Sequence, residues 1–277
     1  MINTIESLPA PALRDYIKCY GLREVDTEGQ QLHLAIHAIE QSLMPFWLSS
    51  TPLQHITEAG IRTIDIKKRW LLGLTSSFQG YQVYNGRYRF FNVQFKNNGF
   101  YSIFKIPMPY ISDQLLIGDD VIGKDLQFLQ EQLEESTNME EMKSAADSYF
   151  LKALFKKKQG YNNDRITTTT NMIAQYNYQI DIKTLARQVN MSLRGLERHF
   201  YEQVGTTPKQ YSKIVRFNKS LLLKTLHPEK KWTDIANQYG YFDQNHLIKD
   251  FKVLAGSSPF NFLEKFQPLP EFLQENF

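Results

Sequence analysis

Residues 185–208 read LARQVNMSLRGLERHFYEQVGTTP, and residues 235–259 read IANQYGYFDQNHLIKDFKVLAGSSP. The second stretch repeats the first at an offset of 50 residues, which becomes 51 after a central turn. The matching positions are Leu185-Ala186 with Ile235-Ala236, Leu196 with Leu247, Phe200 with Phe251, Gly205 with Gly256, and Thr207-Pro208 with Ser258-Pro259. Each copy predicts a helix, a tight turn and a second helix, followed by a glycine and a hydroxyl-Pro helix start.

The turn and the caps of each copy carry residue types that suit a two-helix unit. Asn190 and Gly240 fall in the turns, where a positive φ is needed, and Gly205 is expected to take a positive φ as well. Ser192 and Asp243 are expected to be the N-caps of the second helices. The residues expected to be buried between the helices are Ala186, Leu196 and Phe200 in the first copy and Ala236, Leu247 and Phe251 in the second.

The remaining face of each second helix is polar. These are the side-chain types that read base edges in the major groove: Arg and Lys for guanine, Asn and Gln for adenine, and Glu for cytosine. For a single helix, an ordinary solvated face is the better interpretation, but the duplication of the whole frame favours DNA reading. The faces consist of Arg194, Glu197, Arg198 and Tyr201 in the first copy and Gln244, Asn245, Ile248, Lys249 and Lys252 in the second.

Between the copies, residues 208–226 form one continuous helical pattern of 19 residues. A helix of that length is about 28 Å long. It can therefore hold two recognition helices about one DNA turn apart, near 34 Å, in successive major grooves. The sequence predicts that one chain reads two adjacent half-sites without dimerising.

The stretch from about 181 to 265 resembles the DNA-binding domain of the AraC/XylS family throughout. Three positions depart from the family pattern: Phe242, where the residue is usually small or polar, Asn245, usually Ser, and Leu247, usually Phe. They leave open which bases the second helix reads. The pattern of the family's second unit is matched by Ile235-Ala236, Gly240-Tyr241, Asp243-Gln244, Phe251-Lys252, Gly256 and Pro259.

The resemblance implies roles for individual residues and an activator that contacts RNA polymerase. Base contacts are expected from Arg194, Glu197, Arg198, Gln244, Asn245, His246, Ile248 and Lys249. Phosphate contacts are expected from Ser192, Tyr201, Lys213 and Lys252. His246 is expected beside the groove rather than as a metal ligand, because no other ligand type lies at a suitable spacing.

The N-terminal half predicts a different fold. Residues 1–112 are dense in aromatic and β-branched residues with frequent turn signals, which favours a β-sandwich or barrel. Asn85-Gly86, between the runs 81–84 and 88–95, favours a hairpin with a type I′ turn. Amphipathic helices are expected over 117–158, packed on this domain or forming a dimer seam.

The predicted class is α+β with two domains. The expected ranges are a sensory or dimerisation domain over 1–158, a linker over 159–165, a helical DNA-binding domain over 166–267 and a tail over 268–277. Residues 160–267 carry fifteen Lys and Arg against nine Asp and Glu, about +6 in a chain whose net charge is +3, which is a modest indication of a polyanionic partner.

Two stretches, Pro9–Tyr20 and Phe95–Pro107, resemble the cupin-like sensory half of some AraC-type regulators, which implies a barrel with an effector pocket. A metal-binding cupin is not expected, since no carboxylate motif accompanies His33, His37 and His55. The candidates to line such a pocket are Tyr81, Tyr84, Tyr88, Phe90 and Tyr101, which are equally well explained as plain core residues.

Composition and motifs narrow the function classes. Cys19 is the single cysteine, so an intramolecular disulfide and a zinc site with two thiolates are excluded. No GxSxG, HExxH, Walker A or GxGxxG motif occurs, so neither an enzyme nor a cofactor is expected. Without a signal peptide or an 18-residue apolar run, a cytoplasmic protein away from membranes is expected. Two alternatives remain open: a cupin-like binder or enzyme fused to a DNA module, and a non-specific architectural DNA binder.

Overall fold

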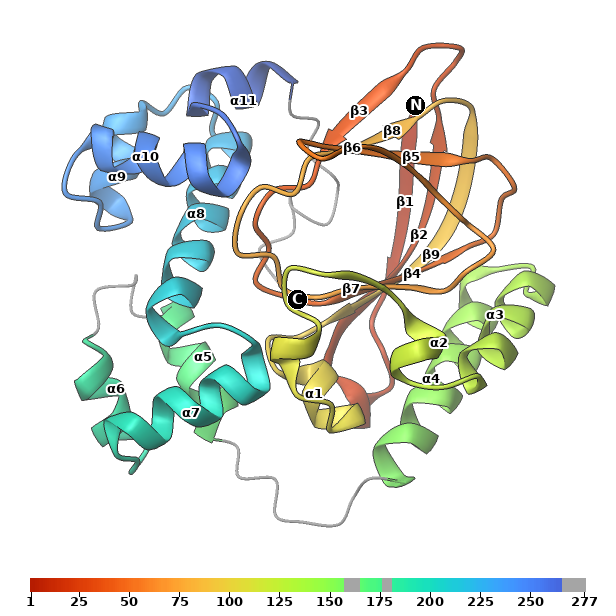
Figure 1. The fold of residues 1–277 in the computed structure, drawn as a ribbon, viewed down its shortest axis with the longest axis horizontal. Coiled ribbons are helices and arrows are strands. Elements are labelled where there is room, and N and C mark those ends of the chain that lie inside the picture. The colour runs from red at the N-terminus through yellow and green to blue at the C-terminus, as the bar shows by residue number, and fades with distance from the viewer. Residues whose placement is uncertain (157–164, 176–180, 266–277) are drawn as a thin grey trace.

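The computed structural model describes residues 1–156, 165–175 and 181–265. The N-terminal half consists of two antiparallel sheets with helices on one side, and the C-terminal half is helical (Figure 1). This arrangement confirms the predicted α+β, two-domain class. The predicted linker, apart from Arg165, and the predicted tail lie outside the described residues.

The two sheets differ in size. Along β9, alternate side chains point to opposite faces, so Phe91 and Val93 enter one core while Phe90 and Asn92 face the other way. The larger sheet has six strands in the order β1 (Ile2–Ser7), β2 (Ile17–Asp26), β9 (Arg87–Phe95), β4 (Leu43–Trp47), β7 (Trp70–Leu72) and β10 (Leu115–Ile117). The smaller sheet has four, in the order β3 (Leu32–Ala35), β8 (Tyr81–Tyr84), β5 (Leu53–Thr57) and β6 (Gly60–Ile64).

Helices cover the face of the larger sheet that the smaller sheet leaves open. Tyr20 and Phe95 of the sheet pack there against Phe150 of α4, with ring centroids 6.5 and 5.6 Å apart. The amphipathic helices therefore pack on their own domain, the first of the two predicted arrangements. The helices of this half are α1 (Gly99–Phe104), α2 (Gly118–Val121), α3 (Asp125–Glu135) and α4 (Met139–Lys156), with short 3-10 helices η1 (Pro11–Leu13) and η2 (Met108–Tyr110).

The predicted hairpin at Asn85-Gly86 is wrong. Strand β8 pairs with β3 and β5, whereas β9 pairs with β2 and β4, so the turn crosses from one sheet to the other. A type I′ turn needs a positive φ at both central residues, and of these two only Gly86 has one, at 123°. Tyr84 and Tyr88 face each other inside the sandwich instead, with ring centroids 4.8 Å apart.

Strands were also expected up to about residue 112, but Gly99–Phe104 is the helix α1. Phe100 and Phe104 both contact Phe95 and lie in the core beneath α4. Apolar residues at helical spacing, buried on most sides, give the same local composition as a buried strand, so the pattern does not distinguish the two.

The C-terminal half packs around one long helix. Tyr211, Ile214, Phe217 and Leu221 of α8 are buried and join both repeats into a single core. Among the described helices of the whole chain, none has the length and apolar character needed to span a membrane. The helices are α5 (Arg165–Gln175), α6 (Ile182–Gln188), α7 (Leu193–Val204), α8 (Pro208–Leu226), α9 (Trp232–Gln238), α10 (Gln244–Ala255) and α11 (Pro259–Lys265).

Candidate nucleic-acid interface

The first helix-turn-helix unit consists of α6 and α7. Asn190 takes the turn with a φ of 53°, and Ser192 caps α7 by accepting a hydrogen bond from the Gly195 amide over 3.1 Å. Leu196 and Phe200 are fully buried. Each of these features confirms the prediction made from the repeat.

The second unit consists of α9 and α10 and uses the same devices. Gly240 has a φ of 68°, and the Asp243 carboxylate accepts a hydrogen bond from the His246 amide over 2.7 Å. Leu247 and Phe251 are fully buried, in the positions that match those of the first unit. The caps and the buried stripes orient the opposite faces of α7 and α10 away from the core.

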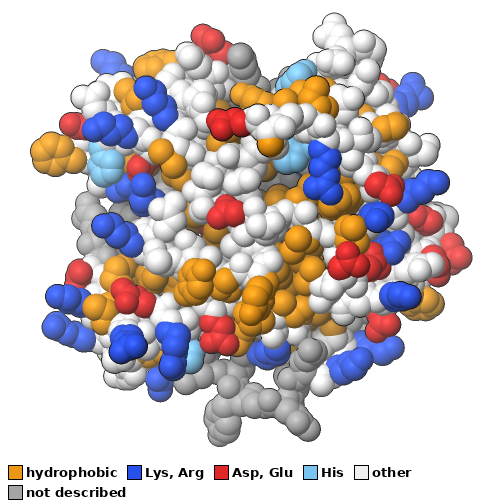
Figure 2. Space-filling model, viewed as in Figure 1, with side chains coloured by type: hydrophobic (Ala, Val, Ile, Leu, Met, Phe, Trp, Pro, Cys, Tyr) orange, Lys and Arg blue, Asp and Glu red, His pale blue; other side chains and the backbone are white. Residues whose placement is uncertain are grey.

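The outer face of α7 is open. Arg194, Glu197, Arg198 and Tyr201 are all exposed, and Tyr201 is 51% exposed although it is aromatic. Figure 2 shows Lys and Arg side chains spread along the left-hand edge of the molecule, over the C-terminal helices. The predicted side chains of the first recognition helix are thus brought together on one accessible surface.

The outer face of α10 is open in part. Asn245, Lys249 and Lys252 are exposed, while Gln244 and Ile248 are half-buried. Phe242, at a position that departs from the family pattern, precedes this helix and is 91% exposed. The surface offered by the second unit therefore carries the charges of Lys249 and Lys252 without an acidic residue among the exposed positions named, and includes an exposed aromatic ring near its start.

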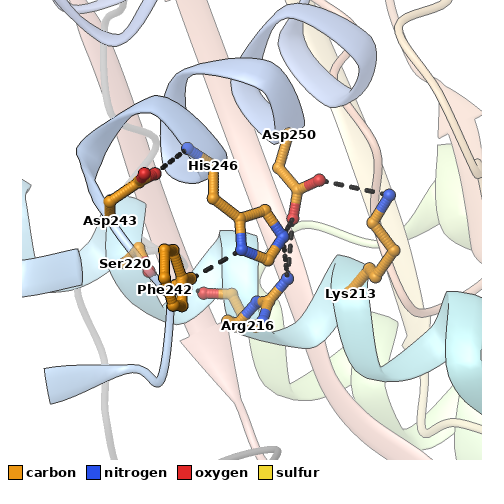
Figure 3. A network of polar contacts seen from close by, with 7 residues as sticks. All are labelled: Lys213, Arg216, Ser220, Phe242, Asp243, His246 and Asp250. Atoms are coloured by element: carbon orange, nitrogen blue, oxygen red, sulfur yellow. Dashed lines mark hydrogen bonds and ion pairs between the residues drawn. The ribbon is translucent and has the colours of Figure 1, made fainter. Parts of the chain in front are cut away.

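Two predicted DNA contacts, His246 and Lys213, turn inward to a polar network between α8 and α10 (Figure 3). Asp250, 4% exposed, accepts from Arg216 over 2.8 Å and forms an ion pair with Lys213 over 3.1 Å. The His246 ring lies between, with Nε2 3.4 Å from the Arg216 guanidinium. The Arg216 guanidinium also stacks over the Tyr241 ring, 4.0 Å from its centroid.

This network holds the second recognition helix on the linker helix. The sequence pattern identified neither Arg216 nor Asp250, because the two residues are 34 positions apart and belong to different helices. The ammonium group of Lys213 is engaged by Asp250 in this structure, whereas Lys252 remains exposed.

The N-terminal domain contacts both units at matching positions. Gly205 ends α7 and Gly256 ends α10, both with a positive φ. A Cβ at Gly205 would overlap Ser112, and one at Gly256 would lie 2.5 Å from the Phe78 ring. The amide of Phe78 also donates to the carbonyl of Val253 over 3.1 Å. Both recognition helices are thus held at their C-terminal ends by the same domain.

Residues 37–40 make a second contact between the N-terminal domain and the C-terminal helices. The Ala38 amide donates to the Leu254 carbonyl over 2.7 Å. The His37 ring, 4% exposed, meets Phe217 and Phe262 edge-on, at 5.7 and 5.9 Å between centroids. Its Nδ1 donates to the Ala38 carbonyl over 2.9 Å, which assigns the tautomer. This neutral ring is part of the interface between the domains.

His37 is expected to make stability depend on pH. Burial lowers its pKa from 6.5 to about 4, so the unfolded chain binds a proton first as the pH falls. Stability is then lost between pH 6.5 and 4, by about 1.4 kcal/mol per pH unit. Urea unfolding at pH 6.5 and pH 5 should show the wild type losing about 2 kcal/mol more than His37→Leu.

Glu40 opposes this trend, because burial raises the pKa of its carboxyl and favours its protonation in the folded state. Both proteins in the comparison contain Glu40, so the difference between them isolates the histidine. Equal losses in the two proteins would show that His37 is not buried between the domains in solution.

Of the candidate effector residues, Tyr84, Tyr88 and Phe90 share one core cluster, whereas Tyr81 and Tyr101 lie elsewhere. Tyr84 and Phe90 line a cavity between the two sheets. Tyr88 donates to the Pro52 carbonyl over 2.8 Å, and Tyr81 packs on Phe78. Tyr101 donates to Glu202 of α7 over 3.3 Å and belongs to the interface between the domains.

The other candidate site residues have structural surroundings. Cys19 is buried, and burial raises the pKa of its thiol to about 12. His55 contacts the Gln79 carbonyl over 2.8 Å, and His33 packs against Tyr81. Within the described part of the chain, no three His, Cys, Asp or Glu side chains are grouped to hold a metal ion.

Residues 185–265 match a family described as Helix-turn-helix domain, and residues 5–116 match one described as Domain of unknown function (DUF6597). The HTH-type transcriptional activator RhaS of Escherichia coli O139:H28 (strain E24377A / ETEC) is 35% identical over 81 residues, 29% of this chain and 29% of that protein. The same protein of Escherichia coli strain K12 / DH10B gives the same values. The chain thus matches less than a third of the length of these relatives.

Among solved structures, ToxT from Vibrio cholerae O395 is similar with 14% identity and a TM-score of 0.49, over 90% of this chain and 98% of that one. The matches to the helix-turn-helix family and to RhaS are confined to the C-terminal part. The family match begins within α6 and spans the rest of both units, the linker helix and α11. The C-terminal part of this chain therefore matches the helix-turn-helix family and is similar there to the transcriptional activator RhaS.

Proposed function

We propose that the protein is a sequence-specific transcription regulator that reads two adjacent major-groove half-sites. The observation that carries the proposal is the pair of matching units on one rigid helix, each with an open recognition face. Helix α8 has 19 residues, about 28 Å of helix, close to one turn of DNA. A non-specific binder has no need of two recognition helices held in a fixed relation.

The roles of individual residues follow from the exposed faces. Arg194, Glu197 and Arg198 of α7 read bases, with Asn245 and Lys249 of α10. Gln244 and Ile248 are half-buried, so each side chain would have to rotate slightly to contact a base. Phosphate contacts come from Ser192 and Tyr201 at the first half-site and from Lys252 at the second.

The same proposal extends to activation and to an effector. RhaS is described as a transcriptional activator, and we take activation through contact with RNA polymerase as the function here. The N-terminal domain, which touches the ends of both recognition helices, would respond to a small molecule. Two recognition helices within one chain make DNA reading independent of a homodimer.

The experiment that tests this is selection of genomic fragments by the purified full-length protein at physiological salt, read by sequencing. Two half-sites about 10 base pairs apart are expected. Binding without any shared motif would support the architectural alternative. The affinity would then come from phosphate contacts alone and would depend on the salt concentration and not on the DNA sequence. Absence of binding by a folded protein would contradict the proposal.

Replacing Arg198 by Ala should weaken binding to the selected site by about 1–3 kcal/mol and relax the preference at one base position. The reason is that Arg pairs with two acceptors of guanine in the major groove. The matched control is Arg187→Ala, which removes an exposed arginine from α6, outside the recognition face. Competition with single-base variants of the site measures the effect. An equal loss on random DNA would exclude base reading by Arg198.

A further inference from the structure

The turn of the second helix-turn-helix unit contains one residue that the first unit lacks, and that residue is Phe242. In both units the turn ends with an amide that donates back to the first helix over 2.9 Å, from Met191 in the first and from Tyr241 in the second. In the first unit the N-cap Ser192 follows directly. In the second unit Phe242 stands between Tyr241 and the N-cap Asp243. The offset of the repeat therefore changes from 50 to 51 residues at Phe242.

The side chain of this extra residue takes no part in the core. Phe242 is 91% exposed, the largest exposed fraction of any large hydrophobic side chain that the structure describes. An apolar residue directly before an N-cap often packs on the fourth residue of the helix, which here is Leu247. Leu247 is fully buried and the Phe242 ring stays in solvent, so this contact is not made. Folding therefore gives no reason for a large aromatic side chain at this position.

The backbone that carries the ring is nevertheless fixed on both sides. The Phe242 amide donates to Nδ1 of His246 over 3.4 Å, and the His246 amide donates to Asp243 (Figure 3). On the other side, Tyr241 is buried beneath the Arg216 guanidinium. An aromatic side chain has only two rotatable bonds, so it loses little conformational entropy when it is covered. Phe242 is thus a rigid apolar group that is ready to bind a partner.

The position of Phe242 indicates what that partner is. The N-terminal residues of a recognition helix contact base edges in the major groove. Phe242 lies two residues before Gln244, the first residue of α10, and three before the exposed Asn245. The apolar group that the major groove presents is the methyl group of thymine, and Phe is one of the side chains that contact it.

The charge beside the ring disfavours the sugar–phosphate backbone as its partner. The first unit has the neutral hydroxyl of Ser192 at the N-cap, which suits a phosphate contact. The second unit has the exposed carboxylate of Asp243 at the matching position. Like charges repel, so a phosphate is less favourable at the start of α10 than at the start of α7. An uncharged base edge carries no such penalty next to Phe242.

We propose that Phe242 reads a thymine in the second half-site through contact of its ring with the thymine methyl group. The inference rests on the proposed DNA-reading function and makes its base preference specific. The face of α7 offers hydrogen bonds and charge, whereas the start of α10 adds an apolar contact that α7 has no residue to match. The two half-sites should therefore differ, with a required thymine in the second beside the base pair that Asn245 reads.

Parallel selection of genomic fragments by the wild type and by Phe242→Ala, at physiological salt, is the first test. Both proteins should recover the same first half-site. The wild type alone should require thymine at one position of the second half-site. The matched control Phe128→Ala removes a ring that is 62% exposed on α3 of the N-terminal domain, and it should recover the wild-type motif.

Replacing that thymine by deoxyuridine removes only the methyl group and isolates the contact. The wild type should bind the uracil duplex about fourfold more weakly, the effect of losing one buried methyl-sized group. Phe242→Ala should bind the thymine duplex about tenfold more weakly than the wild type does, and should not distinguish thymine from uracil. Phe242→Leu keeps an apolar contact and should retain part of the discrimination. Fluorescence anisotropy with labelled duplexes measures each affinity.

Stability separates a loss of contact from a loss of fold. Because the ring is exposed, Phe242→Ala should unfold at the same urea concentration as the wild type. A shared motif for the wild type and Phe242→Ala would keep the regulator function and overturn the reading of thymine by Phe242. A loss of affinity by Phe242→Ala that is equal for thymine and uracil would also overturn it, and would assign the ring to the backbone. If the folded wild type selects no motif, the regulator function fails, and this inference fails with it.

Discussion

Replacing Asp250 by Asn is expected to lower the free energy of unfolding by about 3 kcal/mol. The carboxylate is 6% exposed and balances both Arg216 and Lys213. Removing one member of a buried ion pair leaves the other charge uncompensated, which costs about 3–5 kcal/mol. We take the lower end because the Lys213 side chain is 32% exposed and is partly solvated. Urea unfolding followed by circular dichroism measures the loss.

The effect on DNA binding should be confined to one half-site. Asp250 joins α10 to α8, so its loss releases the second recognition helix while α7 keeps its own core. Affinity for a complete site should fall strongly, and affinity for a site that contains the first half alone should change little. An equal loss of affinity for the complete site and for the first half-site alone would mean that the Asp250 network stabilises both units.

Two further variants make the result specific. Asp234→Asn makes the same chemical change at an exposed position of α9 and should alter stability by less than about 0.5 kcal/mol. The double variant Asp250→Leu with Arg216→Met removes both charges and should recover much of the loss, because an apolar pair of similar volume is often as stable as a buried ion pair. A double variant as unstable as Asp250→Asn would point to packing rather than to charge.

The features that were predicted correctly from the sequence are local. A cap, a positive φ or a buried i, i+4 pair depends on residues within one turn, so Asn190, Ser192 and Gly240 could be assigned from the repeat alone. The duplication strengthened each assignment, because two copies had to satisfy the same geometry. The same reasoning gave the bounds of α8, since Thr207-Pro208 marks its start.

The features that were missed depend on contacts between distant segments. Asn85-Gly86 is an ordinary hairpin signal, and only the pairing of β8 with β3 shows that the chain changes sheets there. His246 has polar neighbours along α10, which made it resemble a DNA contact. The packing of α10 on α8 instead places its ring next to Arg216. Sequence composition selected Tyr84 and Phe90, which line the cavity between the sheets, but not Arg23 and Trp47, which the strand register also brings there.

Gly205→Val should destabilise the protein by about 2–5 kcal/mol, as the sum of two costs. Gly205 has a φ of 87°, and a left-handed conformation costs a residue with a Cβ roughly 1–2 kcal/mol, more when it is β-branched. The added side chain would also overlap Ser112 and Met108 of the N-terminal domain, and overpacking of this kind costs about 1–3 kcal/mol.

Gly29→Val separates the two costs. Gly29 has a φ of 82°, and a Cβ there meets nothing within 4 Å, so only the backbone cost applies. The difference in unfolding free energy between the two variants therefore measures how tightly the first unit docks on the N-terminal domain. Adding Ser112→Gly to Gly205→Val should recover part of that difference and leave the backbone cost. If Gly205→Val is no more harmful than Gly29→Val, the end of α7 is free in solution, and the N-terminal domain then governs DNA reading through the second unit alone.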